Sequence, residues 1–257
     1  MDVLSAAFYD DKIAWYENRM NDKQCNDGYT YFEVLPETAT IQSGDSCLFN
    51  DDLEALSELI VANDLVDDSN ALEVGNQTWA EGRLKILTAS YNPSGANGVN
   101  TQLTTLPESF GNLSALTTLY LEWNSLTGLP QSFSQLTNLT SLTINNNWLT
   151  ELPSDIGNLE NLFFLDLGYN QLNAIPASLC TMVSLVYLYL FNNELTALPD
   201  CICNLSIDWS GQDGGWSPYF ASGGNYLCEN VPDCISSSSY FESTLDQFYY
   251  SVIQDAP

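Results

Sequence analysis

Carboxylates are the side chains best suited to chemistry in this sequence, since its 257 residues include 33 Asp and Glu but no His. Without histidine, neither a Ser-His-Asp nor a Cys-His arrangement can form. Adjacent carboxylates could bind calcium, although none has the spacing of an EF-hand; these pairs are Asp10/Asp11, Asp51/Asp52 and Asp67/Asp68. A solvated acidic face is the favoured interpretation. No carboxylate pair is singled out for glycoside hydrolysis, so we predict a non-catalytic protein without a metal or cofactor, with calcium as an open alternative.

The charge balance excludes several classes of partner. Five Lys and Arg give a net charge of −28, and no basic residue follows Lys85. Nucleic acids and anionic membranes attract basic side chains, so we expect no nucleic-acid binding. No segment is long and apolar enough to span a membrane, so no membrane insertion is expected either. The charge suits either good solubility alone or a saline or calcium-containing setting.

A 23-residue period organises the middle of the chain. An apolar-Pro step recurs at this interval, at Leu106-Pro107, Leu129-Pro130, Leu152-Pro153, Ile175-Pro176 and Leu198-Pro199. Between these steps runs Leu-x-x-Leu-x-Leu-x-x-Asn-x-Leu, complete in four copies that begin at Leu116, Leu139, Leu162 and Leu185. A degraded copy, Leu84, Leu87, Ala89 and Asn92, comes before an insertion, "PSGANGVNTQ".

These copies resemble the leucine-rich repeat family in its 23-residue form, over about residues 84–209. The resemblance implies an α/β fold, a right-handed solenoid or horseshoe arc with a parallel β-sheet on its concave face. Successive strands would lie about 4.8 Å apart. Leu119, Leu142, Leu165 and Leu188 would then line up in one interior row. Each proline would start the convex return, where the inside would be filled by Phe110, Phe133, Ile156, Leu179 and Ile202.

The recurring asparagine is predicted to be structural. Where the chain leaves each strand, its amide can satisfy backbone groups that would otherwise be buried without a partner. Stacked turns would therefore carry an asparagine ladder, whereas Asn145 and Asn146 are expected to face solvent. The predicted ladder residues are Asn92, Asn124, Asn147, Asn170 and Asn193.

A repeat array needs caps at both ends. "FNDDLEALSELIVAN" predicts a helix with Asn50 as its N-cap, and the helix followed by Trp79 resembles the N-terminal cap of plant-type extracellular leucine-rich repeat proteins. Towards the other end, "NYLCENVPDCI" resumes Asn-x-Leu after a loop. We divide the chain into an aromatic N-terminal segment (1–47), an N-terminal cap (48–83), repeats (84–209), and a C-terminal cap and tail (210–257).

The seven cysteines lie in the flanks and the last turns. Cys25 and Cys47 are the natural pair of the N-terminal cap. Shared register would bring Cys180 close to Cys203, and Cys201 close to Cys234, within the disulfide range of about 4.4–6.8 Å between Cα atoms. Cys228 is then left over, and it would be free, bonded to another molecule, or exchanged with a cysteine of one of these pairs. Oxidised caps indicate a secreted, extracellular protein, the alternative being reduced cysteines in a cytosolic repeat.

Two processing features bear on localisation. The N-terminal stretch up to Thr30 contains no continuous apolar run of signal-peptide type, so either a signal was removed before this numbering begins or there was none. Asn-x-Ser/Thr triplets make glycosylation candidates of Asn76, Asn112, Asn138 and Asn204.

The concave face is the predicted binding surface. Residues between the framework leucines would face it, and many are aromatic, which favours binding because exposed aromatics are costly unless covered and are enriched at hot spots. The predicted binding residues are Tyr120, Glu122, Trp123, Phe164, Asp166, Tyr169, Tyr187, Tyr189 and Phe191. The last two turns are the most aromatic, so we expect the centre of contact near Tyr187, Tyr189, Phe191, Phe164 and Tyr169.

Two functions follow from this surface. The first is an extracellular, non-enzymatic recognition protein for a protein, peptide or glycan ligand. The second is a structural subunit that assembles head-to-tail into a filament or surface layer. A third arrangement, in which the chain's own N-terminal segment or tail covers the face, also stays open.

Overall fold

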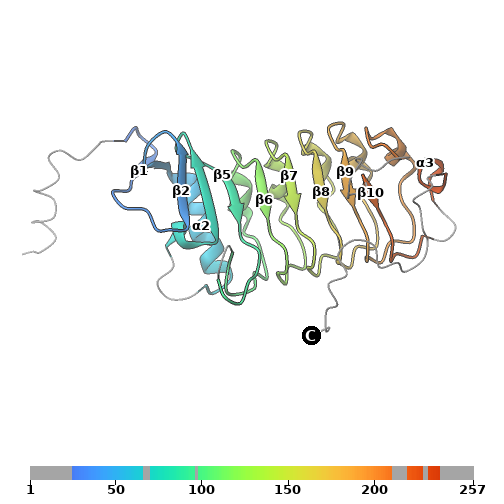
Figure 1. Cartoon of the computed structure of the whole chain (residues 1–257), viewed down its shortest axis with the longest axis horizontal. Helices are drawn as coiled ribbons and strands as arrows, with labels where there is room; N and C mark the ends of the chain where they lie inside the picture. The colour runs from blue at the N-terminus through green and yellow to red at the C-terminus, as the bar shows by residue number, and fades with distance from the viewer. Residues whose placement is uncertain (1–24, 66–69, 96–97, 210–218, 228–230, 238–257) are drawn as a thin grey trace, which may run out of the picture.

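The computed structural model describes residues 25–65, 70–95, 98–209, 219–227 and 231–237. Its main feature is one sheet in the strand order β10-β9-β8-β7-β6-β5-β4-β2. Five of these strands are parallel neighbours: β5 (Arg83–Thr88), β6 (Thr118–Tyr120), β7 (Ser141–Thr143), β8 (Phe164–Asp166) and β9 (Tyr187–Tyr189). They lie side by side along the long axis of the molecule (Figure 1).

The leucines stack as predicted. Leu119 is paired in register with Leu142, Leu142 with Leu165, and Leu165 with Leu188. Each is at most 1% exposed. Because side chains alternate across a strand, the residues on either side of each leucine point to the opposite face of the sheet, here called the outer sheet face.

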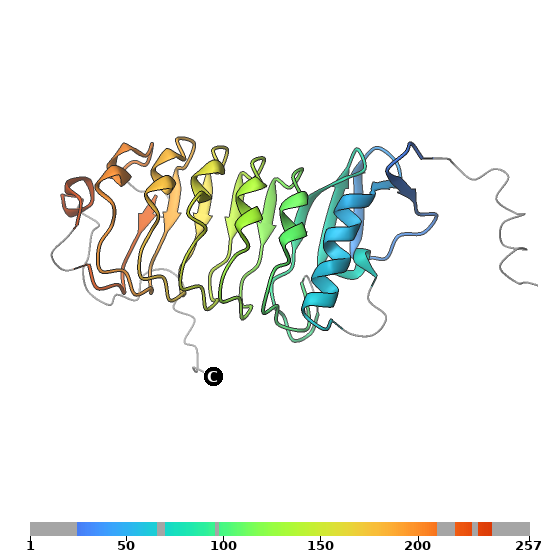
Figure 2. The ribbon, with the colours of Figure 1, turned by 180° about the vertical axis from the view of Figure 1, so that it is seen from behind.

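Short 3-10 helices form the second layer, on the side of the sheet away from the outer sheet face (Figure 2). Proline cannot donate a backbone hydrogen bond and its ring holds φ in the helical range, which suits a helix start. Four of the five helices begin directly after the proline of the apolar-Pro step. These helices are η3 (Glu108–Asn112), η4 (Gln131–Gln135), η5 (Ile156–Asn158), η6 (Ala177–Thr181) and η7 (Asp200–Asn204). They bury Phe110, Phe133, Ile156, Leu179 and Ile202 against the leucine row.

The N-terminal flank extends the same sheet by two strands, β4 and β2, and adds a separate two-stranded sheet of β1 and β3. Its elements are β1 (Tyr29–Tyr31), β2 (Ala39–Ser43), β3 (Cys47–Phe49), α2 (Asn50–Ala62), η2 (Ala71–Glu73) and β4 (Asn76–Ala80). β2 pairs with β4, and β1 pairs with β3. Trp79 of β4 is fully buried in the core. The N-cap prediction was wrong by one residue: α2 begins at Asn50, whose Oδ1 accepts a hydrogen bond from Thr30 Oγ1.

A buried ion pair joins this cap to the first repeat strand. Arg83 donates to Asp52 from Nε (2.8 Å) and Nη2 (2.9 Å), and the backbone N–H of Leu84 donates to the same carboxylate. Asp52 is completely buried, so the expectation that the Asp51/Asp52 pair belongs to a solvated face is wrong for Asp52. The hydrogen bonds from Arg83 to Asp52 raise the pKa of the guanidinium.

The C-terminal turn contains β10 (Phe220–Ala221), which pairs in parallel with β9, and α3 (Asp233–Ser236). Disulfides join Cys180 to Cys201 and Cys203 to Cys234, so the predicted pairs Cys180–Cys203 and Cys201–Cys234 were wrong. The reason is geometric: position 201 of η7 lies beside position 180 of η6 (Cα–Cα 5.7 Å), which frees Cys203 for Cys234 of α3. The Cys25–Cys47 pair is as predicted.

Some predictions lie outside the described residues. They concern positions 1–24, Asp67/Asp68, Cys228 and the C-terminal tail from position 238. Within the described residues, no helix has the length and apolarity that crossing a membrane requires.

Candidate binding site on the outer sheet face

The outer sheet face carries the columns that the repeat predicts. Thr118, Ser141, Phe164 and Tyr187 are register partners in one column. Tyr120, Thr143, Asp166 and Tyr189 form the next. The strands alone therefore place these side chains in rows that cross the sheet.

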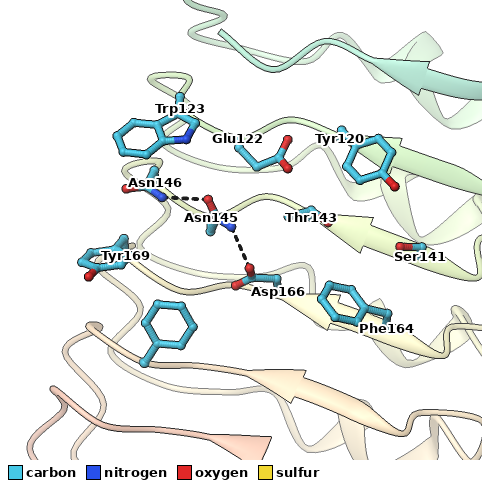
Figure 3. A pocket seen from close by; sticks show the side chains of 11 residues that line it. Tyr120, Glu122, Trp123, Ser141, Thr143, Asn145, Asn146, Phe164, Asp166 and Tyr169 are labelled. Atoms are coloured by element: carbon cyan, nitrogen blue, oxygen red, sulfur yellow. Dashed lines mark hydrogen bonds between the residues drawn. The ribbon is translucent and has the colours of Figure 1, made fainter. Parts of the chain in front are cut away.

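A pocket of about 520 Å³ opens over β6, β7 and β8. This volume lies within the range of about 300–1,000 Å³ that is usual for ligand pockets. Its walls include every predicted binding residue except Tyr187 and Tyr189 (Figure 3). The lining residues are Tyr120, Glu122, Trp123, Ser141, Thr143, Asn145, Asn146, Phe164, Asp166, Tyr169 and Phe191.

One wall of the pocket has an unusual backbone conformation. Trp123, Asn146, Tyr169 and Asn192 occupy the same position in successive turns and have φ of 65°, 54°, 51° and 50°. The first three line the pocket, whereas Asn192 does not. This left-handed region suits Gly and Asn but is costly for bulky residues, by roughly 1–2 kcal/mol. Trp123 and Tyr169 therefore hold their aromatic side chains at the pocket at an energetic cost to the fold.

Two carboxylates lie in the pocket. Asp166 accepts hydrogen bonds from the Gly168 backbone N–H (2.9 Å) and from Asn145 Nδ2 (2.6 Å), and Glu122 accepts one from Ser90 Oγ. Burial is the main cause that raises the pKa of both acids above their ordinary values. The negative charge of Asp166 raises the pKa of Glu122 further, so the two groups are close enough to interact.

Asn145 and Asn146 belong to this site, although they were not among the predicted binding residues. Both are half-buried and line the pocket instead of facing open solvent. Asn146 Nδ2 donates to Asn145 Oδ1 (2.7 Å), and Asn145 in turn donates to Asp166. Their position beside the predicted binding columns was the available signal, but the polar partner on the next strand was not apparent from local sequence.

Of the expected centre of contact, Phe164, Tyr169 and Phe191 line the pocket, but Tyr189 and Phe191 are buried. Tyr189 is only 4% exposed and Phe191 only 3%. The ring of Tyr189 packs against Phe164 (centroids 5.3 Å apart), while Phe191 packs against Tyr169 (5.3 Å) and lies over Gly168. Tyr189 is thus core, and the open part of the surface lies towards β6–β8.

The asparagine ladder holds the edge of the strands beside the pocket. Asn147 Nδ2 donates to the Leu121 carbonyl of the preceding turn (2.9 Å), and its Oδ1 accepts from the Leu126 backbone N–H (3.0 Å). Asn124, Asn170 and Asn193 repeat the pattern. Asn92 departs from it, because its Oδ1 accepts from Ser94 within the inserted segment.

Asn225 is a ladder residue that the prediction missed. Its Oδ1 accepts from the Leu195 backbone N–H (3.0 Å), and its Nδ2 donates to the Leu190 carbonyl (2.8 Å). The Asn-x-Leu of "NYL" was the signal for it. The loop before it breaks the regular repeat spacing, so counting alone does not find this residue.

Other predicted sites lie away from the pocket. Asn112, Asn138 and Asn204 are exposed in or near the 3-10 layer, whereas Asn76 is half-buried in β4. In the described part of the chain, no three His, Cys, Asp or Glu side chains group in a way that could hold a metal ion.

Comparison with known proteins agrees with this architecture. The leucine rich repeat family pattern matches residues 100–149 and 137–195, whereas curated protein sequences give no match. Among solved structures, a leucine-rich repeat protein of Leptospira interrogans is 34% identical over 48% of this chain and 36% of its own, with a TM-score of 0.44.

Two other solved structures, at lower identity, share the fold. A plant ice-binding protein is 24% identical, with 74% of this chain and 61% of its own covered and a TM-score of 0.55. The leucine-rich repeat ectodomain of the receptor kinase SOBIR1 from Arabidopsis thaliana is 22% identical, with 72% and 96% covered and a TM-score of 0.52. With their stacked strands, asparagine ladder and match to the family pattern, residues 100–195 of this chain form leucine-rich repeats.

Proposed function

We propose that this chain is an extracellular, non-enzymatic recognition protein that binds a protein or peptide partner in the pocket of the outer sheet face. The proposal includes the right-handed arc expected for the repeats, which would make this face the concave one. Disulfides at both caps support an extracellular setting, because such bonds persist in oxidising compartments.

The observation that carries the proposal is that Trp123 and Tyr169, which line the pocket, occupy a left-handed position that Asn146 and Asn192 fill in the other turns. Strain of this kind clusters at functional sites, where the surrounding structure holds it in place. Trp123 is also 42% exposed, so it contributes less to the core than a buried tryptophan. Trp and Tyr are the residues most enriched at binding hot spots, which favours a partner that covers them.

Selection from a phage library of random heptapeptides would test this function. The double variant Trp123→Ala/Tyr169→Ala removes two pocket aromatics. Trp148→Ala/Tyr226→Ala is its matched control, since Trp148 (47% exposed) and Tyr226 (66%) do not line the pocket. We expect selected peptides to bind the wild type and the control alike, and to bind the pocket variant at least tenfold more weakly. Peptides that bind all three proteins equally would refute the proposal.

Head-to-tail assembly is the competing proposal. Large apolar side chains are exposed in both flanks, with Val34 at 81% and Tyr226 at 66%. Light scattering coupled to size-exclusion chromatography separates the two functions. A monodisperse monomer at high protein concentration and high salt would count against a filament subunit.

A further inference from the structure

The pocket sets two carboxylates between two aromatic flanks. In Figure 3, Glu122 and Asp166 lie near the middle with Asn145 between them. Trp123 and Tyr169 lie on one side of them, and Tyr120 and Phe164 on the other. A ligand that enters here meets negative charge at the centre and ring surfaces at its sides.

The negative charge of this pocket has no positive partner in the lining. The lining contains neither Lys nor Arg, and the sequence has no basic residue after Lys85. The hydrogen bonds to these acids come from neutral groups, namely the side chains of Ser90 and Asn145 and the backbone of Gly168 and of Glu122 itself. An ionised carboxylate offers about four acceptor sites, so both acids retain capacity for further donors.

The aromatic flanks suit a cation as well. Aromatic faces attract cations within about 6 Å of the ring centroid, most strongly for Trp and Tyr. Burial makes the ionised acids costly in the empty pocket, which is why burial raises their pKa. A cationic ligand would relieve this cost, whereas a neutral one would leave it in place.

We propose that this pocket binds the guanidinium group of an arginine side chain in a partner peptide. This inference rests on the proposed function and names its ligand chemistry. Arginine fits better than lysine because the guanidinium is planar, weakly hydrated and rich in donors, and because it both stacks on aromatic rings and pairs with carboxylates. A neutral sugar could stack on the same rings but would leave both carboxylates uncompensated.

The test uses the peptide acetyl-Gly-Ser-X-Ser-Gly-amide, with X as arginine, lysine or citrulline. Citrulline has nearly the shape of arginine but no charge. Binding to the folded protein would be followed by the NMR signals of the tryptophan indole N–H groups, in about 0.15 M salt, which limits long-range attraction to about 8 Å. The Trp123 signal reports the pocket, and the Trp148 signal reports a site outside it.

We expect the arginine peptide to shift the Trp123 signal but not the Trp148 signal, with a Kd at least tenfold lower than that of the citrulline peptide. Glu122→Gln should weaken arginine binding about tenfold or more. Glu160→Gln removes the same charge from an exposed position outside the pocket, and should change the Kd less than twofold. Asp166→Asn, checked for folding by its melting temperature, should weaken binding as Glu122→Gln does.

Three outcomes would overturn the guanidinium assignment. They are a citrulline or lysine peptide that binds as well as the arginine peptide, an arginine peptide that leaves Trp123 unshifted, and equal effects of Glu122→Gln and Glu160→Gln. The last would mean that the protein's overall charge attracts the peptide. After any of these outcomes the proposed function would still hold if the binding of selected heptapeptides depended on Trp123 and Tyr169. Selected heptapeptides that contain no arginine would likewise support the proposed function and contradict the guanidinium assignment.

Discussion

Asn147 shows how one polar side chain stabilises a stack of turns. It is buried and satisfies backbone groups of its own turn and of the preceding one. Asn147→Ala should lower the free energy of unfolding by about 1–3 kcal/mol, because those groups would be left without partners. Chemical denaturation measures the change. Asn158→Ala, the same substitution at an exposed position, should have almost no effect, and equal effects of the two would argue against the ladder.

Trp123, unlike Asn147, should lower the stability of the folded protein. Asn tolerates the left-handed backbone that costs Trp roughly 1–2 kcal/mol, so Trp123→Asn should raise the free energy of unfolding by about 1 kcal/mol relative to Trp148→Asn. Trp148 is similarly exposed but has no positive φ. Denaturation curves of both variants measure the difference. A larger loss for Trp123→Asn would show that its ring packs as a core residue.

The raised pKa of Glu122 and Asp166 predicts a pH dependence of stability. A folded state in which the pKa of an acid is raised binds protons more tightly than the unfolded state, so the contribution of these acids to stability decreases as pH rises. The decrease starts near the ordinary values of 3.8 and 4.5 and is complete above the raised values. Glu122→Gln should therefore gain stability over the wild type at pH 7 but not at pH 4.

Melting temperatures between pH 4 and 7 test this expectation, with Glu160→Gln as the control. A stability difference between Glu122→Gln and wild type that stays constant across this range would contradict it. The same sign applies to ligands: binding of a cation should weaken as pH falls and the two acids take up protons.

At the scale of elements, the disulfides determine how firmly the last turns are attached. The Cys203–Cys234 bond joins η7 to α3 and closes a chain segment with a sequence separation of 31 residues. Replacing both cysteines by serine should lower the free energy of unfolding by about 2–4 kcal/mol, mainly because the unfolded chain gains freedom. An unchanged denaturation midpoint would show that packing alone holds the cap.

For the molecule as a whole, the net charge of −28 acts against compactness. Because the sequence has only five basic residues, the repulsion between most acidic side chains can be reduced only by dissolved salt. Raising the ionic strength from about 10 to 150 mM shortens the screening length from about 30 to 8 Å and should raise the melting temperature. A comparison of sodium and calcium at equal ionic strength would separate screening from specific binding. If calcium binds specifically, calcium alone should raise the melting temperature markedly.

Features that are local to one turn could be predicted from the amino-acid order. The regular repeat interval assigned each leucine, proline and ladder asparagine its position, because each framework position meets the same neighbours in every stacked turn. The columns of the outer sheet face were predicted from the alternation of side chains across each strand, which is why most of the predicted binding residues line one pocket. Where the period is broken, at Asn92 and Asn225, the prediction failed or missed a residue.

Tertiary packing alone fixed which positions of neighbouring turns meet. The cysteine pairing depended on where η7 lies beside η6 and α3, not on shared register. The burial of Tyr189 and Phe191 depended on how neighbouring rings fill the outer sheet face. The ion pair between Asp52 and Arg83 and the bond from Asn145 to Asp166 join different elements. Such contacts depend on side-chain packing across turns, which a periodic pattern does not specify.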